Sequence, residues 1–387
     1  MGLADFAAEY RERGVELAAR VAEVARSGRF VLGPAVASFE QALARAAGLG
    51  HAVGVACGTD ALVLALRAVG VGPGDVVVTT PLSFVATAEA VVRVGARPRF
   101  VDVDPSTLCL DPEQVEAYLH RCGRGGDGQV ADPTTGGRVA ALLPVHLFGR
   151  VADVARLGAL GRQVGAPVVE DAAQAVSARA GATPLGRHGP VCVSFFPTKN
   201  LGAWGDGGAV LCDDGDVAAL VRSLRVHGVT EAGTFAQLGY NSRLDALQAA
   251  VLEAKLGWLA DLERRRQANA ARYRRRLASI ARPDGLRLPD PLCEGDVVHQ
   301  FTVRVPPSWR QPLRGHLDRA GIDTAVYYPR LLCDQPALAE SALVDSDLPA
   351  ARAASDEVLS LPVHPYLSTA DIDRVADAVA ELVASKS

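Results

Sequence analysis

The sequence predicts an α/β protein whose large domain is built on a mostly parallel sheet flanked by helices. Apolar runs typical of buried strands alternate with helix-like runs through the first two-thirds of the 387 residues. Glycine-rich or polar turns separate these runs. From about residue 244 the pattern becomes long and helical, which indicates a change of domain. We therefore expect a large domain at 1–250 and a smaller α+β domain at 251–387 that includes the linking helix.

The expected elements follow in order from their local patterns. Short apolar or β-branched runs predict a seven-stranded sheet, with strands at Val53–Cys57, Val76–Thr80, Arg99–Val103, Ala140–Val145, Val168–Asp171, Val191–Phe196 and Gly208–Cys212. Helices are expected between them at Ala61–Val69, Ala86–Val94 and Val151–Val164. A long helix is expected at Leu244–Leu277, near the change of domain, followed by a strand at Val298–Val305 and helices at Leu313–Ala320 and Thr369–Ala384. The stretch Arg121–Arg138 is rich in glycine, aspartate and threonine, which predicts an exposed loop.

Composition excludes several classes of protein. Hydrophobic residues make up 49% and charged residues 22% of the chain, as in soluble globular proteins. The formal net charge of -4 gives no sign of nucleic-acid binding. No apolar run approaches the roughly 18 residues that span a membrane, and Met1–Tyr10 does not resemble a secretory signal. The seven cysteines are scattered and never form CxxC, so we expect no metal site, no disulfides and a cytoplasmic location.

Lys199 is the first candidate for catalysis. It ends the segment Ser194-Phe195-Phe196-Pro197-Thr198-Lys199, and glycines follow at 202, 205, 207 and 208. This pattern places the lysine in a turn at the end of a strand. For a single lysine, a solvated position is the ordinary alternative. A lysine that forms a Schiff base needs a lowered pKa, which burial and a neighbouring positive charge can supply.

Two carboxylates follow the valines in Val168-Val169-Glu170-Asp171-Ala172-Ala173-Gln174. Ligands bind outside the carboxyl ends of strands in an open α/β sheet, so Asp171 is placed to face a pocket. Pyridoxal phosphate is an electron sink only while its ring nitrogen is protonated, and a paired carboxylate keeps that proton there. Gln174 lies one helical turn on and can bond the ring oxygen from the same pocket face. A helix N-cap is the alternative role for Asp171.

Two further patterns fit the same cofactor. Gly58 allows a close backbone approach, and Thr59 brings a hydroxyl to the amides at a helix start, an arrangement that receives phosphate. Ser194 can add its hydroxyl to that phosphate. Phe84, at the end of another strand, can stack on a flat pyridine ring. An ordinary capped helix and simple core packing are the respective alternatives.

In this order, the segments resemble the DegT-like (DegT/DnrJ/StrS) sugar aminotransferases, which are pyridoxal-phosphate enzymes of fold type I, the aspartate aminotransferase fold group. The resemblance covers almost the whole chain. It also includes Gly33-Pro34 with Phe39-Glu40, Phe100 to Asp104, Pro144 to Gly149, and Asn241 to Asp245. So many matches in one order make a chance origin a poor explanation.

The resemblance implies a role for each candidate residue. Lys199 is the expected Schiff-base lysine, Asp171 the partner of the ring nitrogen, and Gln174 the contact to the ring oxygen. The other expected cofactor contacts are Gly58, Thr59, Phe84 and Ser194. Asn241 resembles an asparagine that reaches the phosphate from the neighbouring subunit. The resemblance therefore implies a homodimer with shared active sites.

The implied activity is transfer of an amino group from an amino acid, L-glutamate in the family, to a nucleotide-linked keto-deoxyhexose in amino-sugar biosynthesis. Lys199 would move a proton in each of two half-reactions. The sequence from Lys199 to Gly208 is similar to that of enzymes of deoxysugar assembly. This similarity favours amination at C3 over C4. His227 and Tyr327 match family positions near the substrate. Many relatives carry histidine at Cys333, and often at Tyr327, so the acceptor is less firmly indicated than the chemistry.

Four other interpretations fit the sequence less well. One is the same amino-group transfer to a keto-cyclitol, but relatives that act on cyclitols usually lack the Phe-Phe-Pro-Thr-Lys sequence. Relatives that dehydrate a sugar at C3 replace the lysine with histidine, whereas Lys199 is intact. A non-catalytic regulatory protein of this fold would be free to lose Lys199, Asp171 or Gln174. A Rossmann dehydrogenase is disfavoured because the glycines from Gly70 to Gly74 do not form GxGxxG.

Overall fold

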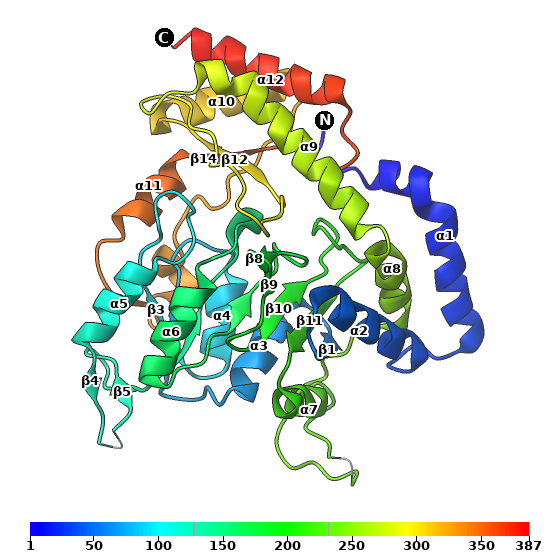
Figure 1. Ribbon diagram of the computed structural model, residues 1–387, viewed down its shortest axis with the longest axis vertical. Coiled ribbons are helices and arrows are strands. Elements are labelled where there is room, and N and C mark those ends of the chain that lie inside the picture. Colours follow the sequence, from blue (N-terminus) through cyan, green and yellow to red (C-terminus); the bar gives the residue numbers. More distant parts are fainter. Residues whose placement is uncertain (127, 231, 387) are drawn as a thin grey trace.

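A mostly parallel sheet forms the centre of the computed structural model (Figure 1), which describes residues 1–126, 128–230 and 232–386. In spatial order its strands are β1 (His51–Val55), β11 (Gly208–Cys212), β10 (Val191–Ser194), β7 (Glu170–Asp171), β6 (Val139–Leu143), β2 (Val76–Thr79) and β3 (Arg97–Phe100). Two isolated parallel bridges, Leu142 with Val168 and Val145 with Asp171, join β6 to β7. Only β11 runs antiparallel to its neighbours among these strands. The predicted fold class is confirmed, and β13 (Leu343–Val344) adds a short strand beside β3.

Strand composition explains this sheet. Alternate residues of β10 enter different cores, because successive side chains of a strand point to opposite faces. Val191 and Val193 pack in one apolar cluster and Cys192 in another. Since the parallel strands end at the same edge, the segments that follow β1, β2, β6, β7 and β10 meet there.

Helices cover both faces of the sheet (Figure 1). One face packs against α3 (Gly58–Ala68), α4 (Ala86–Arg93) and α7 (Gly215–Leu224). The other face packs against α2 (Pro34–Ala47), α5 (Pro112–Arg121) and α6 (Val154–Val164). Residues Ala61–Leu66 of α3 are all buried, as expected for a helix that is apolar on every side.

The N-terminal helix α1 (Phe6–Ser27) was not among the predicted elements. Only Gly14, Leu17 and Val24 are buried in it, so its apolar stripe is too sparse for a clear periodic signal. It packs against α8 (Ala246–Leu256). The remaining short elements are β8 (Arg179–Ala180), β9 (Thr183–Pro184) and α11 (Pro349–Glu357), with 3-10 turns at Leu147–Gly149, Ala278–Ile280, Leu332–Asp334 and Pro336–Leu338.

The predicted long helix is two helices, α8 and α9 (Leu259–Leu277), which meet at Gly257 and Trp258. Figure 1 shows α9 running from the large domain to the small domain at the top of the view. There it packs with β12 (Phe301–Arg304), β14 (Val358–Leu361), α10 (Pro307–Arg319) and α12 (Thr369–Ala384). Helix α12 has its predicted bounds, set by a capping box at Ser368 and Asp371. The domain division at residue 250 stays a prediction.

The stretch Arg121–Arg138, predicted to be an exposed loop, contains a short hairpin of β4 (Gly123–Arg124) and β5 (Val130–Ala131). The prediction fails at the base of the hairpin, where Asp132 is buried. The carboxylate of Asp132 accepts hydrogen bonds from Arg99 and from the Tyr118 hydroxyl at 2.8 Å. Position 127 of this stretch lies outside the described residues.

Candidate active site

Lys199 lies in the turn that follows β10, at the carboxyl edge of the sheet. Its backbone N–H donates to the Phe196 carbonyl at 2.8 Å, which closes the turn. A Cβ on Gly202 would lie 2.2 Å from the Pro197 carbonyl oxygen, so this glycine lets the chain pack under the turn. Burial lowers the pKa of Lys199 to about 8, although the nearby Asp171 carboxylate opposes this effect. Its amine is therefore neutral, and nucleophilic, more often than that of a solvated lysine.

The chain contains three lysines, all of them described. Lys255 is buried on α8, where its Nζ donates to the Gly202 carbonyl at 2.8 Å and pairs with Glu9 at 2.5 Å. Lys386 is exposed near the C-terminus. Of the three, Lys199 alone follows a strand of the sheet.

Asp171 is buried at the end of β7. Its Oδ2 accepts a hydrogen bond from the Thr87 hydroxyl at 2.8 Å, and its Oδ1 accepts one from the Ala173 N–H at 3.1 Å. Burial raises the pKa of Asp171, while these two donors, Lys199 and His146 act in the opposite direction. Turns rather than a helix follow Asp171, so it caps no helix. A buried, oriented carboxylate is suited to hold a proton on a ring nitrogen.

Gln174 is buried beside Asp171, although a turn rather than the expected helix brings it there. Its Oε1 accepts a hydrogen bond from the Phe148 N–H at 2.6 Å. Its Nε2 donates to the Tyr328 hydroxyl at 3.1 Å. The Phe148 donor fixes which end of the amide is oxygen, so the second Nε2 proton remains for a ligand.

A second buried pair stands behind Asp171. His146 and Glu170 are both fully buried, with His146 Nε2 at 3.1 Å from Glu170 Oε2. The Ala152 N–H donates to His146 Nδ1 at 3.1 Å, so the imidazole proton is on Nε2 and points at Glu170. The backbone N–H of His146 donates to the Asp171 carbonyl at 2.9 Å. The pair therefore fixes the backbone that carries Asp171.

Gly58 and Ser194 form a tight cradle at the start of α3. A Cβ on Gly58 would lie 2.7 Å from the Ser194 Cβ and 3.1 Å from its Oγ. Cys57 is the N-cap, and the first N–H groups of α3 have no acceptor within the helix. Thr59 follows Gly58 in the first turn. These donors suit a phosphate group, as the sequence predicted.

Two aromatic residues lie near the amide of Gln174. Phe84 is 57% exposed, and its ring centroid lies 6.4 Å from that of Tyr328. The Tyr327 ring meets the Tyr328 ring edge-on at 5.7 Å, and Tyr327 is half-buried. Phe84 is therefore exposed enough to stack on a bound flat ring.

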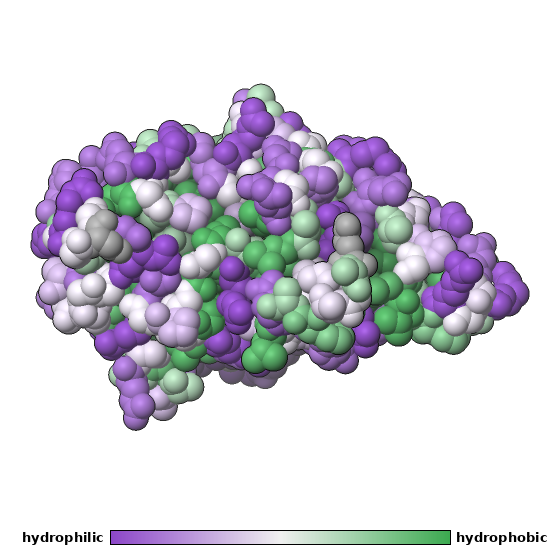
Figure 2. All heavy atoms as spheres, turned by 90° about the horizontal axis from the view of Figure 1, so that it is seen from below, coloured by the Kyte–Doolittle hydropathy of each residue, from purple (hydrophilic) through white to green (hydrophobic). Residues whose placement is uncertain are grey.

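Asn241 and His227 lie apart, beyond α7. Val226 forms an antiparallel bridge with Asn241, and the side chains of His227 and Asn241 are both exposed. Asn241 lines a cavity of about 470 Å³ that also includes Val31 and Ala56. The loop after α7 projects from the lower end of Figure 1, and Figure 2 shows apolar side chains among polar ones at that end.

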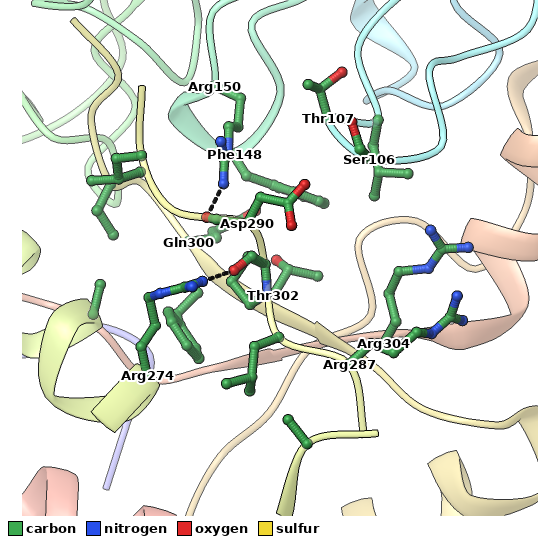
Figure 3. Close-up of a pocket in the computed structure, with 18 of the residues that line it drawn as sticks. Ser106, Thr107, Phe148, Arg150, Arg274, Arg287, Asp290, Gln300, Thr302 and Arg304 are labelled. Atoms are coloured by element: carbon green, nitrogen blue, oxygen red, sulfur yellow. Dashed lines mark hydrogen bonds between the residues drawn. The ribbon is translucent and has the colours of Figure 1, made fainter. Parts of the chain in front are cut away.

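A cavity of about 630 Å³ is lined by residues from segments 105–150 and 270–304 (Figure 3). Phe148 contributes to its wall, but Lys199, Asp171 and Gln174 do not. Four of the arginines that line it already have partners within the chain. Arg150 and Arg274 donate to backbone carbonyls of the 289–291 segment, and Arg287 and Arg304 pair with Glu357. We assign no ligand to this cavity.

The buried site fits pyridoxal phosphate. The Gly58–Ser194 cradle, which a Cβ would fill, matches the phosphate. Asp171 matches the ring nitrogen, the spare Nε2 proton of Gln174 matches the ring oxygen, and the amine of Lys199 matches the aldehyde. Among the described residues, no group of three or more His, Cys, Asp or Glu side chains could hold a metal ion.

The sequence did not indicate every residue of this site. Thr87, His146, Phe148 and Tyr328 all contact or orient the expected residues, yet none was a candidate. Tyr328 stands beside the predicted Tyr327, and a polar aromatic pair was the only available signal. Residues 174 and 328 are brought together by tertiary folding, which local spacing does not report.

Comparison with known proteins gives consistent matches. Residues 12–380 match the sequence model of the DegT/DnrJ/EryC1/StrS aminotransferase family. The chain is 41% identical over 379 residues to the dTDP-3-amino-3,4,6-trideoxy-alpha-D-glucose transaminase of Streptomyces venezuelae, covering 97% of this chain and 94% of that protein. It is 40% identical over 380 residues to a "pleiotropic regulatory protein" of Geobacillus stearothermophilus, covering 97% of both.

Solved structures agree with these sequence matches. The structure of S. venezuelae DesV in complex with a ketimine intermediate has a TM-score of 0.89 and 40% identity, over 98% of this chain and 97% of that chain. NtdA of Bacillus subtilis, with the bound cofactor PMP, has a TM-score of 0.86 and 29% identity, over 96% of this chain and 82% of that chain.

Proposed function

Because the chain belongs to the DegT/DnrJ/EryC1/StrS aminotransferase family of pyridoxal-phosphate enzymes, we propose that it transfers an amino group from L-glutamate to a nucleotide-linked keto-deoxyhexose. The observation that carries this proposal is Lys199, a lysine with a lowered pKa near the buried carboxylate of Asp171. The acceptor class rests on the similarity to the S. venezuelae transaminase. That relative also supports amination at C3 rather than C4.

In this proposal Asp171 and Gln174 bind the cofactor ring, and Lys199 transfers protons. When bound, pyridoxal phosphate supplies an electron sink for the bond that breaks at the donor's α-carbon. Asp171 keeps a proton on the ring nitrogen, and Gln174 donates to the ring oxygen. Lys199 Nζ takes the proton from the α-carbon of glutamate in the first half-reaction. In the second it gives a proton to the carbon that receives the amino group.

The phosphate and ring face are held by separate groups in this proposal. Gly58 and Thr59 offer amides and a hydroxyl from α3, and Ser194 offers a hydroxyl from β10. Phe84 stacks on the ring face. Tyr327 is proposed to contact the sugar, because it is half-buried beside Tyr328. His227 is proposed to approach the sugar from the exposed loop.

We also propose a homodimer that shares its active sites. Asn241, Val31 and Gly205 line one cavity. Phe30 and Trp204, which precede Val31 and Gly205 in the chain, are exposed. Phe235 and Leu238, in the loop after α7, are 68% and 89% exposed. Exposed apolar residues of this kind mark an interaction surface. A second copy placed there would bring its Asn241 toward the phosphate cradle.

A cytoplasmic location is part of the same proposal. The cysteines described as free include Cys57 and Cys333, in line with a reducing compartment. Helices long and apolar enough to cross a bilayer are absent from the described residues.

A regulatory role is the second candidate, favoured by the name of the G. stearothermophilus relative. Cofactor binding separates the two candidates. A purified protein that stays colourless after incubation with pyridoxal phosphate would support the regulatory role.

The acceptor is tested in two absorbance steps. The holoenzyme is converted to its pyridoxamine form with glutamate, and excess donor is removed. Nucleotide-linked 3-keto and 4-keto deoxyhexoses and a keto-cyclitol are then added separately. We expect the original absorbance to return with the 3-keto sugar. Return with the 4-keto sugar or the cyclitol instead would correct the acceptor, and failure of glutamate in the first step would correct the donor.

A further inference from the structure

The phenol of Tyr328 has a hydrogen-bond proton that Gln174 does not use. The Phe148 N–H occupies Gln174 Oε1 at 2.6 Å, so the group facing Tyr328 at 3.1 Å is the Nε2 donor. The Tyr328 oxygen is therefore the acceptor in this contact. A phenol that accepts one hydrogen bond still has its own proton to donate.

Tyr328 lies among the residues that the proposed function assigns to the cofactor ring. Its ring centroid is 6.4 Å from that of Phe84, and its hydroxyl contacts the amide assigned to the ring oxygen. Burial raises the pKa of Tyr328, and the negative charge of Asp171 acts in the same direction. The phenol therefore keeps its proton across the working pH range.

Tyr328 is anchored to the same segment as Phe84. The Ser355 hydroxyl donates to the Tyr328 carbonyl at 3.0 Å. The backbone N–H of Leu332 donates to the Pro81 carbonyl at 2.8 Å. The first bond holds Tyr328 to α11, and the second ties the segment that carries Tyr328 to the segment that precedes Phe84.

We propose that Tyr328 is a further catalytic residue, whose hydroxyl donates a second hydrogen bond to the phenolic ring oxygen of pyridoxal phosphate beside Gln174. This inference rests on the proposed function. Two donors on one oxygen stabilise its negative charge, as they do for any anionic acceptor. The ring oxygen then interacts less strongly with the proton on the nitrogen that would link Lys199 to the cofactor. Tyr328 thus helps to keep this nitrogen unprotonated for the incoming amino donor.

The test is a pH titration of the visible absorbance of the holoenzyme and of Tyr328→Phe. Phenylalanine keeps the ring packing against Phe84 and Tyr327 and removes only the donor. Loss of a hydrogen bond to a charged group should raise the titration midpoint by about 1 to 2 pH units. Tyr273→Phe is the matched control, because the Tyr273 phenol donates to the Pro362 carbonyl at 2.8 Å and contacts none of the proposed site residues. It should leave the midpoint within about 0.3 pH units, well below one lost hydrogen bond.

A midpoint for Tyr328→Phe equal to that of the holoenzyme would overturn the inference. An equal rise in Tyr273→Phe would also overturn it, since the effect would then not be specific to the Tyr328 hydroxyl. Gln174→Leu provides a second variant, which removes the other donor and should likewise raise the midpoint; an unchanged midpoint there contradicts the two-donor arrangement. If the wild-type protein shows no absorbance that depends on Lys199, the proposed function fails instead.

Discussion

Replacing Gly58 with alanine tests the phosphate cradle directly. The new Cβ would lie 2.7 Å from the Ser194 Cβ, 3.1 Å from its Oγ and 3.2 Å from its Cα. Contacts this short force Ser194 or the start of α3 to move, which costs about 1–3 kcal/mol for an overpacked site. Movement of Ser194 also removes a hydroxyl from a charged phosphate, a loss of about 1.5–3 kcal/mol. The overpacking destabilises both the free and the cofactor-bound protein, whereas the lost hydroxyl contact weakens only the cofactor-bound protein.

We therefore expect Gly58→Ala to bind pyridoxal phosphate about 10- to 100-fold more weakly, since about 1.4 kcal/mol corresponds to a tenfold change in affinity. The assay is a titration of the apoprotein followed by absorbance. Gly72→Ala is the matched control, because nothing lies within 4 Å of a Cβ at that position. Wild-type affinity in Gly58→Ala, with folding intact, would refute the assignment of the cradle to the phosphate.

Three further changes have defined outcomes. Asp171→Asn should lower kcat on the order of 100-fold, about 3 kcal/mol of activation free energy, in steady-state assays; a near-normal kcat would mean that another group holds the ring proton. Glu170→Gln should lower the free energy of unfolding in urea by about 1–3 kcal/mol, because its amide cannot accept from both His146 and the Gly186 N–H; equal stability would contradict the pairing. The rate at which apoprotein captures pyridoxal phosphate should rise with pH and level off above about 8, as Lys199 loses its proton; a flat profile in stopped-flow absorbance would show that Lys199 is not the group that limits capture.

Burial explains which parts of the fold were visible in the sequence. The strands around Val78 and Val193 are apolar up to their last residue because helices cover both faces of the sheet. Helix α1 gave no comparable signal, since most of its side chains face solvent. The break between α8 and α9 at Gly257 was also missed. A single glycine within a helical pattern does not by itself end a helix.

The candidate site was predicted where its residues directly follow strands. Lys199, Asp171 and Gln174 became candidates in this way, and a turn rather than a helix carries Gln174. Tyr328 could not be found in this way, because it contacts Gln174 from a segment 154 residues away. Phe148 contributes only its backbone N–H to Gln174, and a backbone donor has no signature in residue type.

The central claim is that Lys199 carries the cofactor. The most direct test is reduction of the holoenzyme with borohydride, which fixes the cofactor to its lysine, followed by peptide mass spectrometry. With only Lys199, Lys255 and Lys386 in the chain, the assignment has three possible outcomes. The account predicts a reduced adduct on Lys199 and none in Lys199→Ala. An adduct on Lys255 or Lys386, or an equal yield of adduct in Lys199→Ala, would contradict it.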